Sequence, residues 1–410
     1  MEIKITTEIK IKNDALPQVS KKSISLLLGS GFSMPMGYPL AKDLNQKLLE
    51  FDKCNVDFGS SGKLFLSDTK ANTYPNNGNN SYQVQFKFCK ELIKKYNEAK
   101  GFDYEQFYDY IYYANLNELN DDELYNQLLK EYSKEKLSKQ FYGLTKIYSQ
   151  MVEYLIKDSN GNNWYDTQTT NFNNISKYDN FLAILKAWSN DCEINVHTLN
   201  HDLLFEAFNM TNLLHDMISD GFSDNCSEYY GKVSSNNCEN MFIRLEKHIR
   251  KYVRPIHLYK LHGSLDYVIH QIKNERNFLE KKQCVKIKKN MYPDDVYLCT
   301  NEGFENDPFI FHSEFLTGST SKILRYNDIF YRELFFKFKK NLQKADKLII
   351  IGYGFKDKEI NSMILENYDY ENKKLYIIDP SLPKLPEEFT NINHEIINKS
   401  IEDITDCDLE

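Results

Sequence analysis

No apolar run in this chain of 410 residues approaches the roughly 20 residues needed to cross a membrane, and the N-terminus lacks the apolar core of a signal peptide. The eight cysteines include no Cys-x-x-Cys pair, so they predict reduced thiols and not a structural zinc site. Positive charge is not in excess either: the net charge of −8 gives no general attraction to nucleic acid or anionic lipid. These absences predict a cytoplasmic protein with no metal, no membrane association and no direct contact with nucleic acid.

Hydrophobic residues make up 41% of the chain and aromatic residues 14%, which is enough for a full hydrophobic core. Five short apolar runs have the length and composition of strands that are buried on both faces of a parallel sheet. They occupy residues 23–28, 194–199, 256–261, 347–352 and 374–379. Helical patterns follow three of the five. This alternation predicts an α/β fold, a Rossmann-like open parallel sheet with helices on both faces.

Two stretches interrupt this alternation. Residues 51–189 are rich in tyrosine and charged helical patterns, which predicts an inserted all-helical module. Residues 219–240 are rich in turn formers and poor in periodicity, which predicts a long loop or lid. The Rossmann-like domain is therefore expected to be discontinuous, formed by residues 20–50 and 190–400, with residues 1–19 as an N-terminal extension.

The first apolar run ends in the segment Gly-Ser-Gly at residues 29–31. Without side chains at Gly29 and Gly31, backbone N–H groups at the strand end can approach a phosphate closely. An ordinary tight turn between a strand and a helix would use the same glycines. A Gly-x-Gly segment alone does not decide between these two interpretations.

Polar residues follow two further strands. Asn200 and Asp202 come directly after the strand at 194–199, and His262 follows the strand at 256–261. The carboxyl ends of parallel strands form the edge at which open α/β sheets bind ligands, so these side chains are candidates for a site. The alternatives are a helix N-cap for Asp202 and a structural role for His262.

The last two predicted strands end in a similar way. Gly352 and Gly354 end the fourth strand at the start of a helix, and Asp379 ends the fifth, where a carboxylate could meet a ribose or adenine. The alternative is that these residues serve sheet topology alone.

Taken together, the motifs resemble those of the sirtuin family. The segment Gly29-Ser30-Gly31-Phe32-Ser33, with Gly37 and Pro39 in step, is similar to the sirtuin glycine motif. Thr198, Asn200 and Asp202 match the Thr-x-Asn-x-Asp element of the family, and His262 matches its histidine element. The resemblance covers most of the chain outside the helical insert, and the three motifs occur in the family's order.

The chain also departs from the sirtuin deacylases. It lacks the two cysteine pairs of their zinc module, and Leu40-Ala41-Lys42 stands where they carry Asp-Phe-Arg. Residues 352–357 and 104–111 look like the prokaryotic sirtuin-like branch of defence proteins. Members of that branch cleave NAD and commonly abort phage infection by depleting it. The resemblance therefore implies a cytoplasmic NAD hydrolase that acts in antiphage defence, with NAD as the substrate and no metal.

Cleavage of the nicotinamide–ribose bond passes through an oxocarbenium-like state, which requires orientation of ribose and water more than protonation of the leaving group. As catalytic residues we expect Asn200 to hold a ribose hydroxyl or the attacking water, and His262 to act as the general base. Asp202 would fix the ribose or the loop.

For binding of NAD, the expected residues lie at two strand ends. Gly29, Ser30, Gly31, Phe32 and Ser33 would cradle the pyrophosphate, with Phe32 closing over the nicotinamide. Gly352, Tyr353 and Asp379 would line the adenosine side.

A hydrolase that depletes NAD must be latent in its own cell, so the helical insert or residues 219–240 are expected to block the site until a trigger acts. The resemblance also implies a homo-oligomer or a separate partner subunit such as a HerA-type ATPase. Two other functions stay open: a sirtuin-type protein deacylase or ADP-ribosyltransferase, and a non-catalytic module that senses NAD or ADP-ribose.

Overall fold

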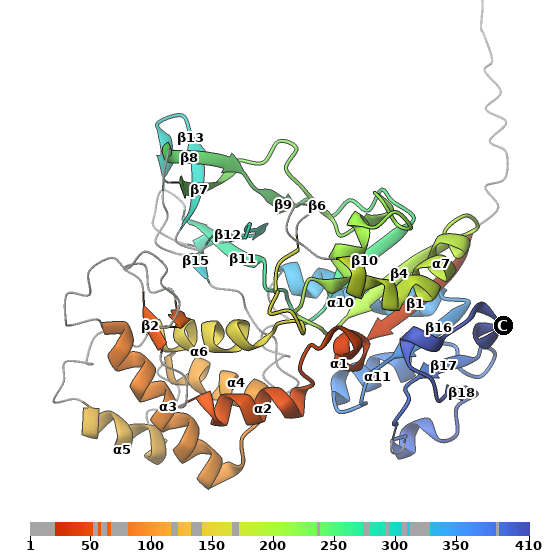
Figure 1. The fold of residues 1–410 in the computed structure, drawn as a ribbon, viewed down its shortest axis with the longest axis horizontal. Helices are drawn as coiled ribbons and strands as arrows, with labels where there is room; N and C mark the ends of the chain where they lie inside the picture. Colours follow the sequence, from red (N-terminus) through yellow and green to blue (C-terminus); the bar gives the residue numbers. More distant parts are fainter. Residues whose placement is uncertain are drawn as a thin grey trace, which may run out of the picture.

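A computed structural model describes most of the chain (Figure 1). The described residues are 21–51, 56–58, 64–66, 81–115, 122–132, 142–165, 172–235, 238–273, 279–289, 291, 295–305, 310–311, 329–382 and 385–410. The predicted N-terminal extension, residues 1–19, lies outside them.

A seven-stranded sheet in which every neighbouring pair is parallel forms the centre of the fold, with the strand order β18-β17-β16-β1-β4-β10-β5. Its strands are β1 (Lys22–Leu28), β4 (Cys192–Thr198), β5 (Ile218–Ser219), β10 (Ile256–Lys260), β16 (Lys347–Ile351), β17 (Leu375–Ile378) and β18 (His394–Ile397). All five predicted strands belong to it, each within two residues of the expected bounds. The two edge strands β5 and β18 were not predicted.

The sheet is buried on both faces because its apolar residues alternate between two cores. Along β1, Leu26 and Leu28 belong to one buried cluster, and Leu27 belongs to the other. Helix α7 packs on the first face, and α10 and α11 pack on the second. These helices are α7 (Asp179–Trp188), α10 (Ile329–Lys344) and α11 (Lys358–Asn367). The predicted α/β class, an open parallel sheet covered on both faces, is confirmed.

The described residues between 51 and 189 are mostly helical but not all-helical, which differs from the prediction. An antiparallel pair, β2 (Val56–Phe58) and β3 (Leu64–Leu66), lies beside the helices. The helices of this insert are α3 (Ser81–Lys100), α4 (Tyr104–Asn115), α5 (Glu123–Tyr132) and α6 (Tyr142–Leu155). Helix α7 also falls before residue 189, yet it packs against β4 and lies beside the sheet (Figure 1). We therefore assign α7 to the layer that covers the sheet.

Two antiparallel sheets were not predicted. One has the order β15-β11-β12-β9-β6 and the other β14-β13-β7-β8. Their strands are β6 (Phe222–Ser223), β7 (Tyr229–Ser235), β8 (Cys238–Arg244), β9 (Glu246–His248), β11 (Tyr267–Lys273), β12 (Leu279–Lys286), β13 (Val296–Thr300), β14 (Gly303–Glu305) and β15 (Ile310–Phe311). The expectation of a loop or lid at 219–240 is thus wrong, because that segment supplies β6, β7 and the start of β8.

Short helices complete the described structure. The α-helices are α1 (Ser30–Ser33), α2 (Ala41–Leu49) and α8 (Leu204–Ala207). The 3-10 helices are η1 (Met34–Met36), η4 (Phe172–Tyr178), η5 (Phe208–Met210), η7 (Glu387–Phe389), η8 (Ile401–Asp403) and η9 (Asp406–Leu409). None of the helices within the described ranges combines the length and the apolarity that a membrane crossing requires.

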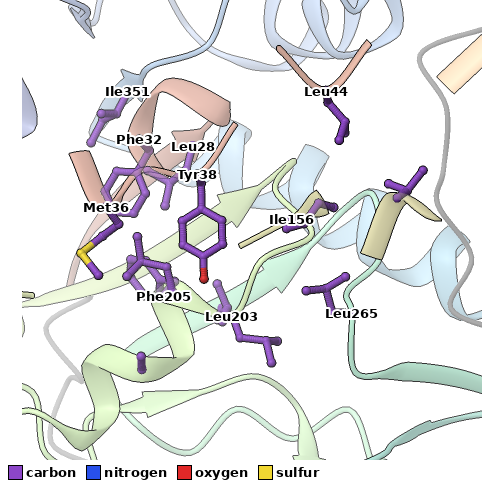
Figure 2. Close-up of a cluster of buried hydrophobic side chains, with 14 of the residues drawn as sticks. Leu28, Phe32, Met36, Tyr38, Leu44, Ile156, Leu203, Phe205, Leu265 and Ile351 are labelled. Atoms are coloured by element: carbon purple, nitrogen blue, oxygen red, sulfur yellow. The ribbon is translucent and has the colours of Figure 1, made fainter. Parts of the chain in front are cut away.

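A single hydrophobic cluster joins the insert to the first face of the sheet. Ile156, which follows α6, and Leu265, which follows β10, belong to this cluster together with Leu28 of β1. Figure 2 shows Tyr38 and Leu203 among the same buried side chains. Because the insert and the sheet share one core, the helices of the insert are held close to the carboxyl edge of the sheet.

Candidate functional site

The candidate site lies at the carboxyl edge of the parallel sheet, where the strand order reverses. From β1 the chain proceeds to β4 on one side, and it later returns to β16 on the other side of β1. In open α/β sheets such a switch point is the usual place for a ligand. The loops that follow β1, β4, β10 and β16 meet at this edge, and they carry most of the residues that the sequence singled out.

The glycines after β1 and β16 are explained by contact between their two loops. The N–H of Gly31 donates to Gly352 O at 2.9 Å, and the N–H of Gly29 donates to Ile351 O at 3.0 Å. A Cβ on Gly29 would lie 2.5 Å from Gly352 O. The N–H of Phe32 also donates within the loop, to Gly29 O at 2.9 Å. These three N–H groups serve backbone contacts in this structure, and the cradling of a pyrophosphate by residues 29–33 stays a prediction.

Gly352 tolerates a side chain least of these glycines, and the nearby Gly354 provides a control for testing this. Its φ is 58°, and a Cβ there would lie 2.4 Å from the backbone N of Phe32. Gly352→Ala is therefore expected to destabilise the protein by roughly 2 kcal/mol or more. The cost of a left-handed backbone conformation for alanine adds to the cost of the clash between its Cβ and the backbone of Phe32. Gly354→Ala is the control, since nothing lies within 4 Å of its Cβ position. Urea denaturation measures both, and equal losses would contradict this account of the loop contact.

Asn200 and Ser33 link the loops after β4 and β1. Asn200 Nδ2 donates to Gly29 O at 2.9 Å and to Ser33 Oγ at 3.0 Å. The Ser33 hydroxyl, which is buried, also hydrogen-bonds to Asp202. Within the described part of the chain, Asn200 Oδ1 accepts no hydrogen bond. The amide nitrogen thus fixes the side chain, and the amide oxygen can accept a hydrogen bond from a ligand.

Asp202 lies in a buried turn at the start of α8. Its Oδ1 accepts the N–H of Leu204 at 3.0 Å in an Asx turn. The N-cap residue of α8 is Leu203, so Asp202 is not the N-cap that the alternative interpretation expected. Burial raises the pKa of Asp202 above its usual value, although Lys260 and Ser33 oppose the shift. Both of its named contacts are with protein groups, so the structure gives Asp202 a positioning role in the loop.

Lys260, at the end of β10, contacts the same turn through its side chain. Its side chain is fully buried, and its ammonium donates to the carbonyl oxygen of Asp202 and forms an ion pair with Glu206 at 3.1 Å. Burial raises the pKa of Glu206 above its usual value, although the Lys260 ammonium opposes the shift. A buried ammonium requires such partners, so Lys260 ties the turn after β4 to the strand beside it.

A second buried lysine extends this charge network toward the antiparallel sheet. Lys286 of β12 pairs with Asp220 and lies 3.6 Å from Asp266. Burial alone would raise the pKa of Asp220, but the adjacent Lys286 ammonium outweighs it and the pKa is lowered. For Lys286, burial lowers the pKa, and Asp220 and Asp266 outweigh it, so the pKa lies well above its usual value. Lys286 and Asp220 therefore each favour the charged form of the other.

His262 lies between two carboxylates. Its Nε2 is 3.3 Å from Asp357 Oδ2, and its Nδ1 is 4.0 Å from Glu105 Oε1. The ring of His201 lies near it, with 6.4 Å between ring centroids. Asp357 is the N-cap residue of α11, and Glu105 lies in the first turn of α4. The sheet domain and the insert therefore each place one carboxylate near this histidine.

Two of the expected NAD-binding residues point into the core. Phe32 is 2% exposed, and its ring contacts those of Tyr178, Phe181, Phe205 and Phe208 (Figure 2 shows Phe32 beside Phe205). It cannot close over a nicotinamide in this arrangement.

Tyr353 is buried as well, and its hydroxyl bonds to Asp357 O at 3.0 Å and Asn361 Oδ1 at 2.9 Å. The hydroxyl of Tyr353 thus has two partners within the protein, and the lining of an adenosine by this residue stays a prediction.

The remaining expected residues lie at the carboxyl edge, and their role in binding stays a prediction. Ser30 is partly exposed in the first turn of α1. Asp379 follows β17, and its Oδ1 accepts the N–H of Ser381 at 2.8 Å.

Sequence reasoning did not find Asp357 or Glu105 as site residues, nor Lys260 as a residue that positions the turn. For Asp357 one signal was present, since an aspartate directly before a helical pattern is a typical N-cap. Its contact with His262 had no signal, because the two residues belong to motifs that are distant along the chain. Across the described ranges, no cluster of His, Cys, Asp and Glu side chains is arranged to hold a metal ion.

The chain was compared with protein-family models and with curated proteins, and neither comparison found a match. The fold and the geometry of the site therefore carry the functional interpretation.

Proposed function

We propose that the protein is an NAD hydrolase that cleaves the nicotinamide–ribose bond. One observation carries the proposal: Asn200 and His262 follow two neighbouring parallel strands at equivalent positions of their register. The register of β4 and β10 pairs Thr198 with Lys260, and Asn200 and His262 each follow two residues later. An amide group and an imidazole thus lie together at the switch point of an open α/β sheet.

These groups suit the chemistry. The bond between ribose C1′ and the nicotinamide nitrogen breaks, and its electron pair neutralises the cationic pyridinium ring. Water forms the new bond to C1′ and gives one proton to His262, which releases it to solvent; the products are nicotinamide and ADP-ribose. Asn200 Oδ1 would accept a hydrogen bond from a ribose hydroxyl or the water, and so orient it.

The test is a time course of NAD with the purified protein, in which nicotinamide and ADP-ribose are both measured. Release of both is expected. Asn200→Ala should lower the rate by about 100-fold or more, because orientation of the reactant is lost. Binding of NAD without release by any variant would instead support a sensing module. Release that requires an acylated peptide would support a deacylase, and transfer of ADP-ribose to protein would support an ADP-ribosyltransferase.

We also propose a biological setting, on the sirtuin-like resemblance alone. The protein would be the toxic effector of an antiphage system, and it would act as a homo-oligomer or with a separate subunit such as a HerA-type ATPase. Depletion of cellular NAD after infection, in cells that carry the gene and not in cells with the Asn200→Ala form, is the expected result.

A further inference from the structure

We infer that Asp357 positions His262 as the tautomer with hydrogen on Nε2, so that Nδ1 is the atom that accepts the proton, on the side where the insert supplies Glu105. The inference rests on the proposed function for its role in catalysis. It adds one positioning residue from the sheet domain and one charged residue from the insert to the proposed site.

Asp357 is held in a fixed orientation by the start of α11. Its Oδ1 accepts the N–H groups of Glu359 at 3.1 Å and Ile360 at 3.2 Å, as an N-cap residue does. Its Oδ2 is thereby turned toward His262 Nε2, at 3.3 Å. Both side chains are buried, with 8% and 4% of their surface exposed. Such a contact orients the imidazole before any ligand arrives.

The contact also selects the tautomer. An ionised carboxylate only accepts hydrogen bonds, so the Nε2 that faces Asp357 carries the hydrogen. Neutral imidazole has one N–H, which leaves the lone pair on Nδ1. A proton from the attacking water therefore goes to Nδ1.

Glu105 lies on that side of the ring. Its Oε1 is 4.0 Å from Nδ1 and accepts the hydroxyl of Tyr104 at 3.0 Å. Asp103 caps the start of α4 through the N–H groups of Glu105 and Gln106, both at 3.1 Å, which fixes the position of Glu105. When Nδ1 takes a proton, the imidazolium lies between two carboxylates, and both stabilise it. The insert thus contributes charge to the site and does not only cover it.

Asp357→Asn tests the tautomer without removing the helix cap. Asparagine keeps an oxygen for the N–H groups of Glu359 and Ile360 and presents an NH₂ group to Nε2, which then becomes the acceptor. In long-range proton–nitrogen spectra of protein labelled with ¹⁵N-histidine, assigned with His262→Ala, Nδ1 of His262 is expected to be unprotonated. In Asp357→Asn it should become protonated, and kcat should fall by about 100-fold or more.

The control is Asp122→Asn, the same change at the N-cap of α5, where Asp122 Oδ1 accepts the N–H of Tyr125 at 2.9 Å. It should leave the His262 signals and kcat unchanged. Glu105→Gln should keep the tautomer and lower kcat about tenfold, less than loss of the base. An unchanged kcat in Glu105→Gln would overturn the role of Glu105.

A wild-type spectrum with hydrogen on Nδ1, or the same tautomer in wild type and Asp357→Asn, would overturn the inference. A failure of the proposed function is distinguishable from this. If no form of the protein cleaves NAD while the spectra change as expected, the positioning of His262 by Asp357 stands and the hydrolase is wrong.

Discussion

His262→Ala is expected to lower the rate of nicotinamide release by about 10²- to 10⁴-fold, the usual contribution of a general base. The variant lacks the imidazole whose Nε2 lies 3.3 Å from Asp357 Oδ2. The attacking water would then have no base to receive its proton. In the proposed mechanism His262 accepts a proton and does not hold NAD, so the KM for NAD should change much less than kcat. Initial rates over a range of NAD concentrations separate these two effects.

Loss of a buried histidine can also destabilise a protein, so the experiment needs a second histidine. His270 of β11 is fully buried and packs its ring on Tyr229, with 5.0 Å between centroids. His270→Gln should cost stability and leave kcat near the wild-type value. If both variants lost activity together with their folded structure, the loss in His262→Ala would report unfolding. A fully active and folded His262→Ala would remove His262 from the mechanism.

The parallel sheet was predictable because its strands are short apolar runs bounded by turn residues. Burial on both faces requires such runs, and Leu26, Leu27 and Leu28 supply both cores at once. The antiparallel strands were not predictable in the same way. Segment 219–240 is rich in polar and turn-forming residues, its first complete strand, β6, has only two residues, and both of those are partly exposed. The pairing of the strands in this segment depends on strands that come later in the chain: β6 pairs with β9, and β7 pairs with β13.

The candidate site was predictable to the extent that it depends on strand ends. Asn200 and His262 follow paired strands, so the parallel topology alone brings them to one edge. The charges around them depend on packing between distant segments. Neither Asp357 nor Glu105 could be assigned to His262 before the positions of α11 and α4 were known. Gly29 and Gly31 had two physical explanations from the sequence, and the close approach of Gly352 shows that loop packing alone requires glycine at both positions.

Lys286→Met is expected to destabilise the protein by about 3–5 kcal/mol, the usual cost when one partner of a buried ion pair is removed. Asp220 and Asp266 would then lose their shared cation, which in the wild type lowers the pKa of Asp220 despite burial. A lowered pKa stabilises the folded state above the unfolded pKa, and this contribution is lost as the pH falls through the folded value.

The loss in Lys286→Met should accordingly shrink when urea denaturation is repeated at acidic pH, where the carboxylates take up protons. Lys288→Met is the control: this lysine is half-exposed and pairs with Glu246 at 3.1 Å. An exposed pair is worth at most about 1 kcal/mol, so this variant should stay close to the wild type at both pH values. Similar losses in the two variants would mean that the Lys286 cluster is solvated and does not anchor the antiparallel sheet beside the site.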